Sequence, residues 1–252
     1  MKKLMNICLV IGLAITLVGC GSSSKEESAK DGAQEIVIGI SPDYPPFDDI
    51  TVDGELTGFD VDMAEWLFNW LNENGYNYTY KWNNMSFDTI ISAIQADQVD
   101  LGVSAFTYDP ERKVLFSVPY YGSAEVALVN ADSDIKTVDD LVGKNIGAQQ
   151  GATGETAANE IEGATVTSMQ DMGIIVETLK TGGVDAVILD IAIANNYAKN
   201  GDFTVLDEAL LDEKTHIIAK EGNDELMDAI NKALEAFLES DAYQQLLEDY
   251  DI

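Results

Sequence analysis

Arg112 is the residue that most invites a chemical explanation, because it is the only arginine in a chain of 252 residues. A guanidinium presents two parallel donors that match the oxygens of a carboxylate, whereas the ammonium of lysine is a compact point charge. Arg112 therefore indicates recognition of a carboxylate. The alternative is a surface arginine in a short helix that begins at Pro110, and Arg112 alone does not decide between the two.

Polar groups also follow apolar segments at places where a ligand would bind. Asp190 comes directly after the apolar segment 186–189, and a glycine-rich loop carries Gln149, Gly151 and Thr153 ahead of a predicted helix. In open α/β sheets, ligands bind beyond the carboxyl ends of the strands. The glycine-rich loop superficially suggests a phosphate site, but it lacks the Gly-Lys-Ser/Thr ending of a P-loop, so we set phosphate binding aside.

The elements that must position these residues are strands alternating with helices. Short apolar or alternating runs predict strands, and apolar residues at helical spacing predict amphipathic helices. We expect strands at 35–40, 76–82, 99–105, 126–129, 145–149, 164–167 and 185–189. We expect helices at 59–74, after a capping Ser86, at 153–160, and over 224 to about 250. This alternation indicates an α/β protein with largely parallel sheets.

The N-terminus has the features of an export signal. Lys2 and Lys3 precede an apolar run at 4–17 that is too short for a comfortable transmembrane helix. The following Leu17-Val18-Gly19-Cys20 resembles a bacterial lipobox. It predicts a signal peptide at 1–19, a lipidated Cys20 and a flexible tether at 20–34, which would hold the protein at the cell surface on the outer face of the cytoplasmic membrane. An ordinary secretory signal with an incidental cysteine is the alternative.

Composition excludes several function classes. The formal net charge is −31, and such a surface repels phosphate backbones, so we expect no nucleic-acid partner. The chain has two cysteines. Cys8 would leave with the signal and Cys20 would be acylated, so no disulfide or thiolate metal site is expected. His216 is the single histidine, and we interpret it as structural. We expect neither a metal nor a cofactor.

Beyond these local signals, the chain resembles the amino-acid-binding family 3 of extracellular solute-binding proteins from ABC importers. The resemblance rests on motifs in one order: DYPPF (43–47), GFDVDMA (58–64), MSFDTIISAIQ (85–95), SAFTYDPERK (104–113), FSVPYY (116–121), GAQQGATGE (147–155) and VDAVILD (184–190). It implies a two-lobed, type II periplasmic-binding-protein-like α/β fold. It also implies that a free L-amino acid is captured by lobe closure and delivered to the transmembrane subunits of an ABC permease.

The resemblance further implies how the chain is divided. Lobe 1 would comprise 35–121 and 217–252, and lobe 2 would comprise 122–216. Two hinge crossings are expected at about 120–124 and 212–216, and closure about them is the expected motion. We expect the protein to act as a monomer.

The ligand's charged groups are assigned by the same resemblance. Arg112 would pair with the α-carboxylate, and Thr107 would offer its hydroxyl and backbone amide to the same region. Gly151 and Thr153 would bring donors from the opposite lobe, where a helix N-terminus adds partial positive charge. Asp190 would accept from the α-ammonium, although it could instead only cap the next helix.

The remaining site residues surround the ligand's side chain. Tyr44 and Phe87 would flank it with one ring on each side, unless both are plain core aromatics. Gln149 would line the pocket. Ala105 stands where many relatives have Ser or Gly, so only its carbonyl can accept from the ammonium. Relatives that bind basic amino acids often carry an acid at the position of Ser41, although Asp43, Asp48, Asp49 and Asp60 could substitute for it from nearby positions. Relatives that bind glutamate or aspartate need a second cation, and no lysine falls on a motif position of the pocket. A neutral, polar amino acid is therefore favoured.

Two other function classes stay open at this stage. One is a cleft enzyme of the cyclohexadienyl-dehydratase type, which would need a positioned acid or base; Asp190 is the obvious candidate in the pocket, and Asp60 could be argued for. The other is a ligand sensor without transport, for which one would expect a transmembrane segment and a signalling domain after Ile252. We expect a binding protein and not an enzyme.

Overall fold

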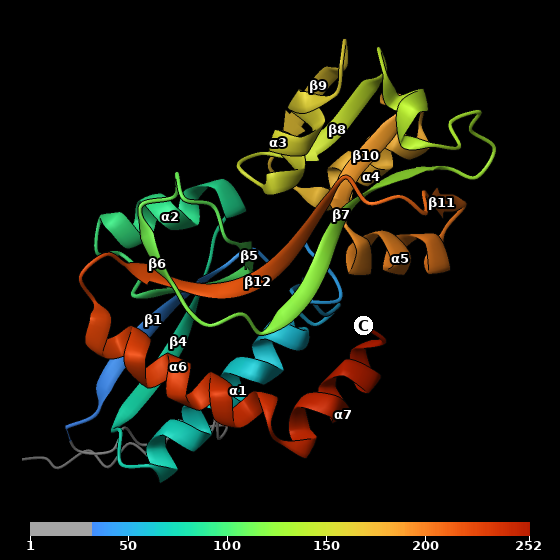
Figure 1. Ribbon diagram of the computed structural model, residues 1–252. Helices are drawn as coiled ribbons and strands as arrows, with labels where there is room; N and C mark the ends of the chain where they lie inside the picture. The colour runs from blue at the N-terminus through green and yellow to red at the C-terminus, as the bar shows by residue number, and fades with distance from the viewer. Residues whose placement is uncertain (1–31) are drawn as a thin grey trace, which may run out of the picture.

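The computed structural model describes residues 32–252 and has two α/β lobes joined by two long strands (Figure 1). Its strands are β1 (Gln34–Ile40), β2 (Asp49–Ile50), β3 (Leu56–Thr57), β4 (Tyr78–Asn84), β5 (Leu101–Thr107), β6 (Val114–Phe116), β7 (Tyr121–Asn130), β8 (Asn145–Gln149), β9 (Thr165–Met169), β10 (Ala186–Asp190), β11 (Phe203–Val205) and β12 (Leu211–Lys220). Its α-helices are α1 (Phe59–Glu73), α2 (Phe87–Gln95), α3 (Thr153–Glu160), α4 (Met172–Lys180), α5 (Ile191–Asn200), α6 (Asp224–Leu238) and α7 (Asp241–Tyr250), with a 3-10 helix at Val138–Leu141.

Lobe 1 is built on the parallel strands β4, β1 and β5, with α1, α2 and α6 around them (Figure 1). The apolar spacing that predicted the first helix is the buried face of α1, where Met63, Leu67 and Leu71 are at most 1% exposed. Helix α1 ends at Glu73, ahead of Gly75 with φ 92°, as expected of a glycine that stops a helix. Ser86 precedes α2, but its side chain makes no capping bond, so that detail of the prediction is wrong.

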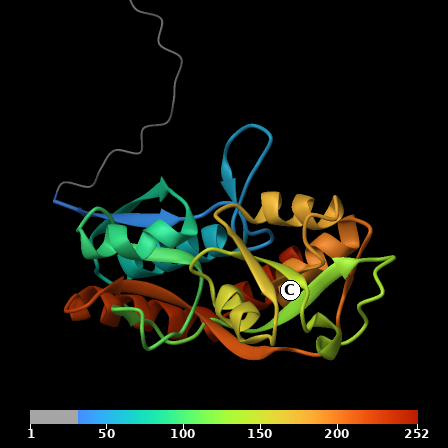
Figure 2. The same ribbon diagram turned by 90° about the horizontal axis from the view of Figure 1, so that it is seen from above.

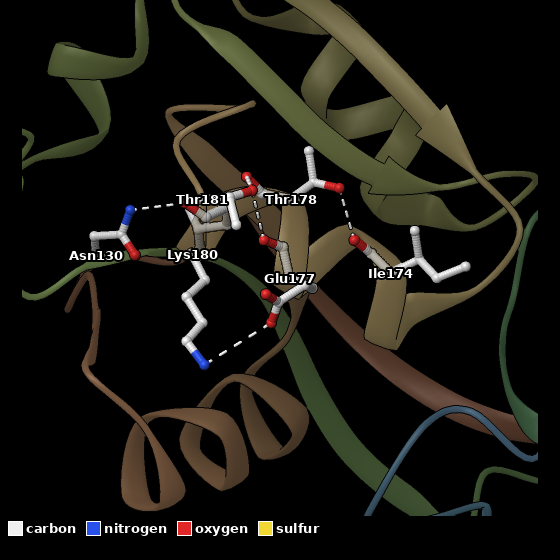
Figure 3. Close-up of polar contacts among 7 residues, drawn as sticks. Asn130, Ile174, Glu177, Thr178, Lys180 and Thr181 are labelled. Atoms are coloured by element: carbon white, nitrogen blue, oxygen red, sulfur yellow. Dashed lines mark hydrogen bonds and ion pairs between the residues drawn. The ribbon is translucent and has the colours of Figure 1, made fainter.

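Lobe 2 is built on β10, β8 and β9, which are also parallel, with α3, α4 and α5 beside them (Figures 1 and 2). Helix α4 is fixed at both ends. At its start, Asp171 accepts a hydrogen bond from the amide of Ile174 at 2.8 Å. Near its end, the side chain of Asn130, the last residue of β7, donates to the carbonyl of Leu179 at 2.7 Å (Figure 3). The end of α4 therefore has a defined position relative to the sheet.

Strands β7 and β12 run through both lobes and pair with each other antiparallel, from Leu211 opposite Glu125 to Thr215 opposite Tyr121. Strand β7 also pairs antiparallel with β10, and β12 pairs antiparallel with β5. The expectation of largely parallel sheets therefore holds for the three strands named in each lobe but is wrong where β7 and β12 pair with them. The reason is that β7 carries the chain from lobe 1 to lobe 2, whereas β12 carries it back. These two ten-residue strands therefore run in opposite directions. The predicted crossings at 120–124 and 212–216 fall on this pair, and their role as a hinge stays a prediction.

The predicted signal peptide, Cys20 and most of the tether lie outside the described residues. The part that is described begins at Gly32, and β1 begins one residue earlier than expected, at Gln34. Among residues 32–252, no helix combines the length and the apolar character needed to cross a bilayer.

Candidate functional site

A small cavity lies where the two lobes meet, and almost all of the predicted site residues line it. Its volume is about 10 Å³, measured as the space open to the centre of a water molecule. The lining consists of Tyr44, Phe87, Ser104, Ala105, Thr107, Arg112, Glu125, Gln149, Ala152, Thr153 and Asp190. Of the predicted residues, Gly151 is the one that is missing from this lining. The structure thus brings together segments that are far apart in the sequence.

Arg112 joins the two lobes. Its Nη1 donates to the carbonyl of Thr107 and its Nη2 donates to the carbonyl of Gly151, both at 2.8 Å. Its guanidinium carbon lies 5.8 Å from the ring centre of Phe87, within the range of a cation–π contact. Residues 109–112 form a turn, so the alternative of a helix begun by Pro110 is not borne out. The guanidinium faces the cavity, where a carboxylate could replace one carbonyl partner.

Asp190 faces the cavity from lobe 2 and is bonded across the cleft to Tyr44. The phenolic hydroxyl of Tyr44 donates to Oδ2 of Asp190 at 2.7 Å, and Ser123 donates to Oδ1. Asp190 directly precedes α5 but makes no side-chain capping bond, so the capping alternative is not borne out. Burial raises the pKa of Asp190. An ammonium that reached this carboxylate would take over the position of the Tyr44 hydroxyl.

The two predicted aromatic residues are buried and line the cavity at the same time. Tyr44 is 8% exposed and Phe87 is 9% exposed. Phe87 stacks on Phe106, with ring centres 4.6 Å apart and ring planes inclined by 22°. The core and pocket interpretations therefore do not exclude each other for these rings.

The glycine-rich loop presents different groups from those expected. The amide of Gly151 donates to Glu155 at 2.7 Å, so Gly151 offers its carbonyl and not its N–H toward lobe 1. The hydroxyl of Thr153 donates to Oε1 of Glu125 at 3.0 Å. The side-chain amide of Gln149 donates across the cleft to Asp43 at 2.9 Å. The donors predicted for this loop are thus already engaged by protein acceptors.

Ala105 has the positive φ of 47°, which is uncommon for a residue other than glycine. Its amide donates to Oδ2 of Asp60 at 2.9 Å, and the hydroxyl of Tyr120 donates to the same oxygen at 3.0 Å. Asp60 is fully buried, and burial raises its pKa to about 7. Asp60 does not line the cavity, so it holds the backbone of Ala105 and is not placed as a proton-transfer group.

Sequence reasoning missed two carboxylates at the site, Glu125 on β7 and Glu213 on β12. Glu125 is 1% exposed and Glu213 is 7% exposed. Oxygen atoms from Glu125, Asp190 and Glu213 lie within 4.8 Å of one another. Glu125 lines the cavity, and Glu213 lies next to it, where it accepts from the hydroxyl of Thr107 at 2.8 Å. No motif marked either residue, because their proximity arises only when the two joining strands pair.

These carboxylates perturb one another. Burial and the neighbouring charge of Asp190 raise the pKa of Glu213 to about 7, and the hydrogen bond from Thr107 only partly offsets this. Burial, followed by the charges of Asp190 and Glu213, raises the pKa of Glu125 well above its ordinary value. All three carboxyl groups therefore keep their protons to a higher pH than isolated carboxyl groups do.

Asp43 forms a second link between the lobes, beside the cavity. Its Oδ2 accepts from Gln149 and from the amide of Met172 at the start of α4, both at 2.9 Å. Its Oδ1 accepts from the hydroxyl of Ser41 at 2.6 Å. Farther out, Gln170 donates to both oxygens of Asp88 at 3.1 and 3.2 Å. The lobes are therefore held together by direct polar contacts on several sides of the cavity.

Two α/β lobes joined by two strands, with an enclosed polar site between them, define a solute-binding protein of the periplasmic type. The sequence profile described as "Bacterial extracellular solute-binding proteins, family 3" matches residues 36–251. The chain belongs to this family.

Curated relatives agree with this assignment. The chain is 31% identical over 254 residues to the "Arginine-binding extracellular protein ArtP" of Bacillus subtilis, covering 98% of this chain and 96% of that protein. It is 30% identical over 261 residues to a "Probable histidine-binding protein" of Campylobacter jejuni, covering 100% of both chains. The relatives are thus amino-acid-binding proteins, but their named ligands differ.

Solved structures show the same fold. The substrate-binding protein of an amino-acid ABC transporter superposes with a TM-score of 0.80 at 30% identity, covering 86% of this chain and 99% of that one. The ancestral amino-acid-binding protein AncCDT-1, described as a precursor of cyclohexadienyl dehydratase, has a TM-score of 0.78 at 30% identity, covering 86% of this chain and 95% of that one. The fold therefore has both binding proteins and a precursor of an enzyme among its neighbours.

Proposed function

We propose that this protein is the substrate-binding component of an amino-acid ABC importer, which captures a free L-amino acid between its lobes and delivers it to the permease. The observation that supports the proposal most is the pairing of one cation and a carboxylate across a single cavity. Arg112 faces this cavity from lobe 1 and Asp190 faces it from lobe 2. A zwitterion needs both groups at close range, because each of its charges loses water on burial.

Capture requires the lobes to move apart first. A cavity of about 10 Å³ holds about one water molecule, which is far less than an amino acid occupies. On binding, the α-carboxylate would replace the carbonyl of Gly151 as a partner of Arg112. The α-ammonium would replace the hydroxyl of Tyr44 as a partner of Asp190, with Thr107 and the Ala105 carbonyl nearby. The ligand would thus take the place of bonds that join the two lobes.

The hinge, the anchor and the oligomeric state belong to the same proposal. Strands β7 and β12 are the natural hinge because they carry the chain across the cleft, at about 120–124 and 212–216. Lobe 1 then comprises 35–121 and 217–252, and lobe 2 comprises 122–216. The chain acts as a monomer, and lipidated Cys20 holds it on the outer face of the cytoplasmic membrane.

The preference for a neutral side chain does not survive into this proposal. It depended on the absence of an acid at Ser41 and on the absence of a second cation for an acidic side chain. Glu125 and Glu213 bring acids to the site from the two joining strands instead.

A second candidate function is a cleft dehydratase, which the pocket's proton-transfer groups favour. Glu213 has a pKa of about 7, which suits a general acid near neutral pH, and it lies beside the cavity. The test is to incubate the protein with cyclohexadienyl carboxylic acids and follow the absorbance of an aromatic product. Turnover that disappears in Glu213→Gln would favour the enzyme over the binding protein.

The binding function is tested by a thermal-shift screen of the full-length protein, purified in detergent, against the free L-amino acids. A ligand that binds only the native state raises the melting temperature by mass action. We expect at least one amino acid to do so in a concentration-dependent manner. If none does, the proposed function is wrong.

A further inference from the structure

The charges at the cavity do not balance for a zwitterionic ligand with a neutral side chain. Among the residues that line the cavity, Arg112 is the one cation. Three carboxylates face it or border it, from Glu125, Asp190 and Glu213. A zwitterion would satisfy Arg112 with its carboxylate and Asp190 with its ammonium. The other two carboxyl groups would then remain buried beside the ligand without a cationic partner, which is costly if they are ionised.

The two additional carboxylates each have an oxygen that is available to a ligand. Glu125 uses Oε1 to accept from Thr153 at 3.0 Å, and its buried Oε2 has no hydrogen-bond partner among residues 32–252. Glu213 uses Oε2 to accept from Thr107 at 2.8 Å, and within the described part of the chain its buried Oε1 has no hydrogen-bond partner. Buried polar atoms are almost always paired in folded proteins. Two unpaired acceptors beside one cavity therefore indicate a donor that arrives with the ligand.

The hydroxyl groups that hold these carboxylates also fix their direction. Thr107 belongs to lobe 1 and orients the carboxylate of Glu213, whereas Thr153 belongs to lobe 2 and orients the carboxylate of Glu125. The direction of each unpaired oxygen is therefore fixed from a different side of the cleft. The site thus has a pair of carboxylates on the joining strands, next to Asp190, which would accept from the α-ammonium.

We propose that the captured amino acid carries a second cationic group, which Glu125 and Glu213 receive together. This inference rests on the proposed function, because it assigns the α-carboxylate to Arg112 and the α-ammonium to Asp190. The oxygens of the three carboxylates lie within 4.8 Å of one another, so the second cationic group comes close to the first. The ligand is then a basic amino acid whose side chain is short or folded back toward its backbone.

A metal ion is the other cation that three carboxylates could hold, and the site suits it less well. The oxygen ligands come without histidine, and the guanidinium charge of Arg112 acts on Glu213 directly. A divalent ion would be repelled by that guanidinium, whereas the carboxylate of an amino acid would neutralise it. A basic amino acid accounts for both features of the site, because its carboxylate pairs with Arg112 and its two cationic groups pair with the three carboxylates.

The experiment is titration calorimetry on the full-length protein in detergent at pH 8, with basic amino acids and neutral matches of similar shape. Arginine is compared with citrulline, and lysine with norleucine. For the basic amino acid that binds more tightly, we expect an affinity at least about tenfold higher than for its neutral match, the effect of about one charge-assisted hydrogen bond. We expect Glu213→Gln and Glu125→Gln each to reduce this ratio. The control Glu177→Gln, at an exposed position on α4, should leave it unchanged.

Several results would overturn the inference. One is equal or tighter binding of the neutral match in the wild type, which needs no variant and so holds even if Glu125→Gln fails to fold. Another is a ratio that Glu213→Gln leaves intact. Binding of Ca²⁺ or Zn²⁺ alone that is lost in Glu213→Gln, with arginine and citrulline bound equally, would establish a metal site instead. Failure of every amino acid to bind would be distinct, because it would remove the proposed function itself.

Discussion

Tyr44 and Asp190, which belong to different lobes, share a hydrogen bond of 2.7 Å from the phenolic hydroxyl to Oδ2. The backbone amide of Asp190 also donates to the same hydroxyl at 3.2 Å. The bond connects the residue proposed to flank the ligand with the residue proposed to bind its ammonium. The hydroxyl of Tyr44 and the ammonium of a ligand would therefore compete for one carboxylate.

Changing Tyr44 to Phe tests this competition, because it keeps the ring and removes the hydroxyl. Without ligand, a buried carboxylate oxygen loses its donor, so we expect a loss of about 1–3 kcal/mol and a lower melting temperature. With ligand, the ammonium supplies the missing donor. The ligand-induced rise in melting temperature should therefore be larger in Tyr44→Phe than in the wild type. An equal or smaller rise would show that the two do not compete.

The carboxylate cluster predicts how stability depends on pH. Burial and Asp190 raise the pKa of Glu213 from 4.5 to about 7, with Glu125 and Arg112 as further charged neighbours. Between these two values the folded protein holds a proton that the unfolded chain has lost, so stability falls as pH rises from about 5 to 7. The contribution of Glu213 is at most about 3 kcal/mol.

Urea unfolding of the ligand-free protein at intervals from pH 5 to pH 8 measures this effect. Glu213→Gln should make the decline shallower without abolishing it, because burial also raises the pKa of Asp60, Asp190 and Glu125. A stability that rises over this range in the wild type would contradict the cluster as described.

The bonds of Asp43 predict what holds the lobes closed. Asp43→Ala removes the single oxygen, Oδ2, that accepts both interlobe hydrogen bonds, from Gln149 and from the amide of Met172. We expect a larger radius of gyration for the ligand-free variant in small-angle scattering, and a return toward the wild-type value with bound amino acid. Asp53→Ala, at an exposed position, is the matched control. An Asp43→Ala protein with the wild-type radius would show that this clamp does not govern closure.

The lipid anchor makes a separate prediction, which concerns residues outside those that the structure describes. Cys20→Ala removes the sulfur that the lipobox-like LVGC motif would expose to acylation. We expect the variant to leave the membrane fraction or to remain unprocessed, as judged by cell fractionation and mass spectrometry. A processed, acylated Cys20→Ala protein in the membrane fraction would refute the assignment.

Some of this site could be predicted from the sequence because the signal was local. Arg112 was conspicuous by its rarity, and Asp190 ended an apolar strand, so the rule about the carboxyl ends of strands pointed to it. The course of α1 and α2 followed from the spacing of their apolar residues.

What could not be predicted depends on contacts between distant segments. Glu125 and Glu213 are ordinary acids in their own strands, and they meet only because β7 and β12 pair antiparallel across the cleft. The same pairing made the centre of the sheet antiparallel where parallel strands were expected. Gly151 was expected to offer its amide to the ligand, but this amide donates to the side chain of Glu155 in the following helix, α3.

The most direct test of the central claim is titration calorimetry of Arg112→Ala, Arg112→Lys and Asp190→Asn with the amino acid found in the screen. Arg112→Ala leaves the buried ligand carboxylate unpaired and should cost about 2–5 kcal/mol of binding free energy. Arg112→Lys keeps the charge without the planar pair of donors and should fall between Arg112→Ala and the wild type. Asp190→Asn should weaken the amino acid strongly and its deaminated analogue much less. If Arg112→Ala binds the amino acid as tightly as the wild type does, the carboxylate is bound elsewhere and the proposed site is wrong.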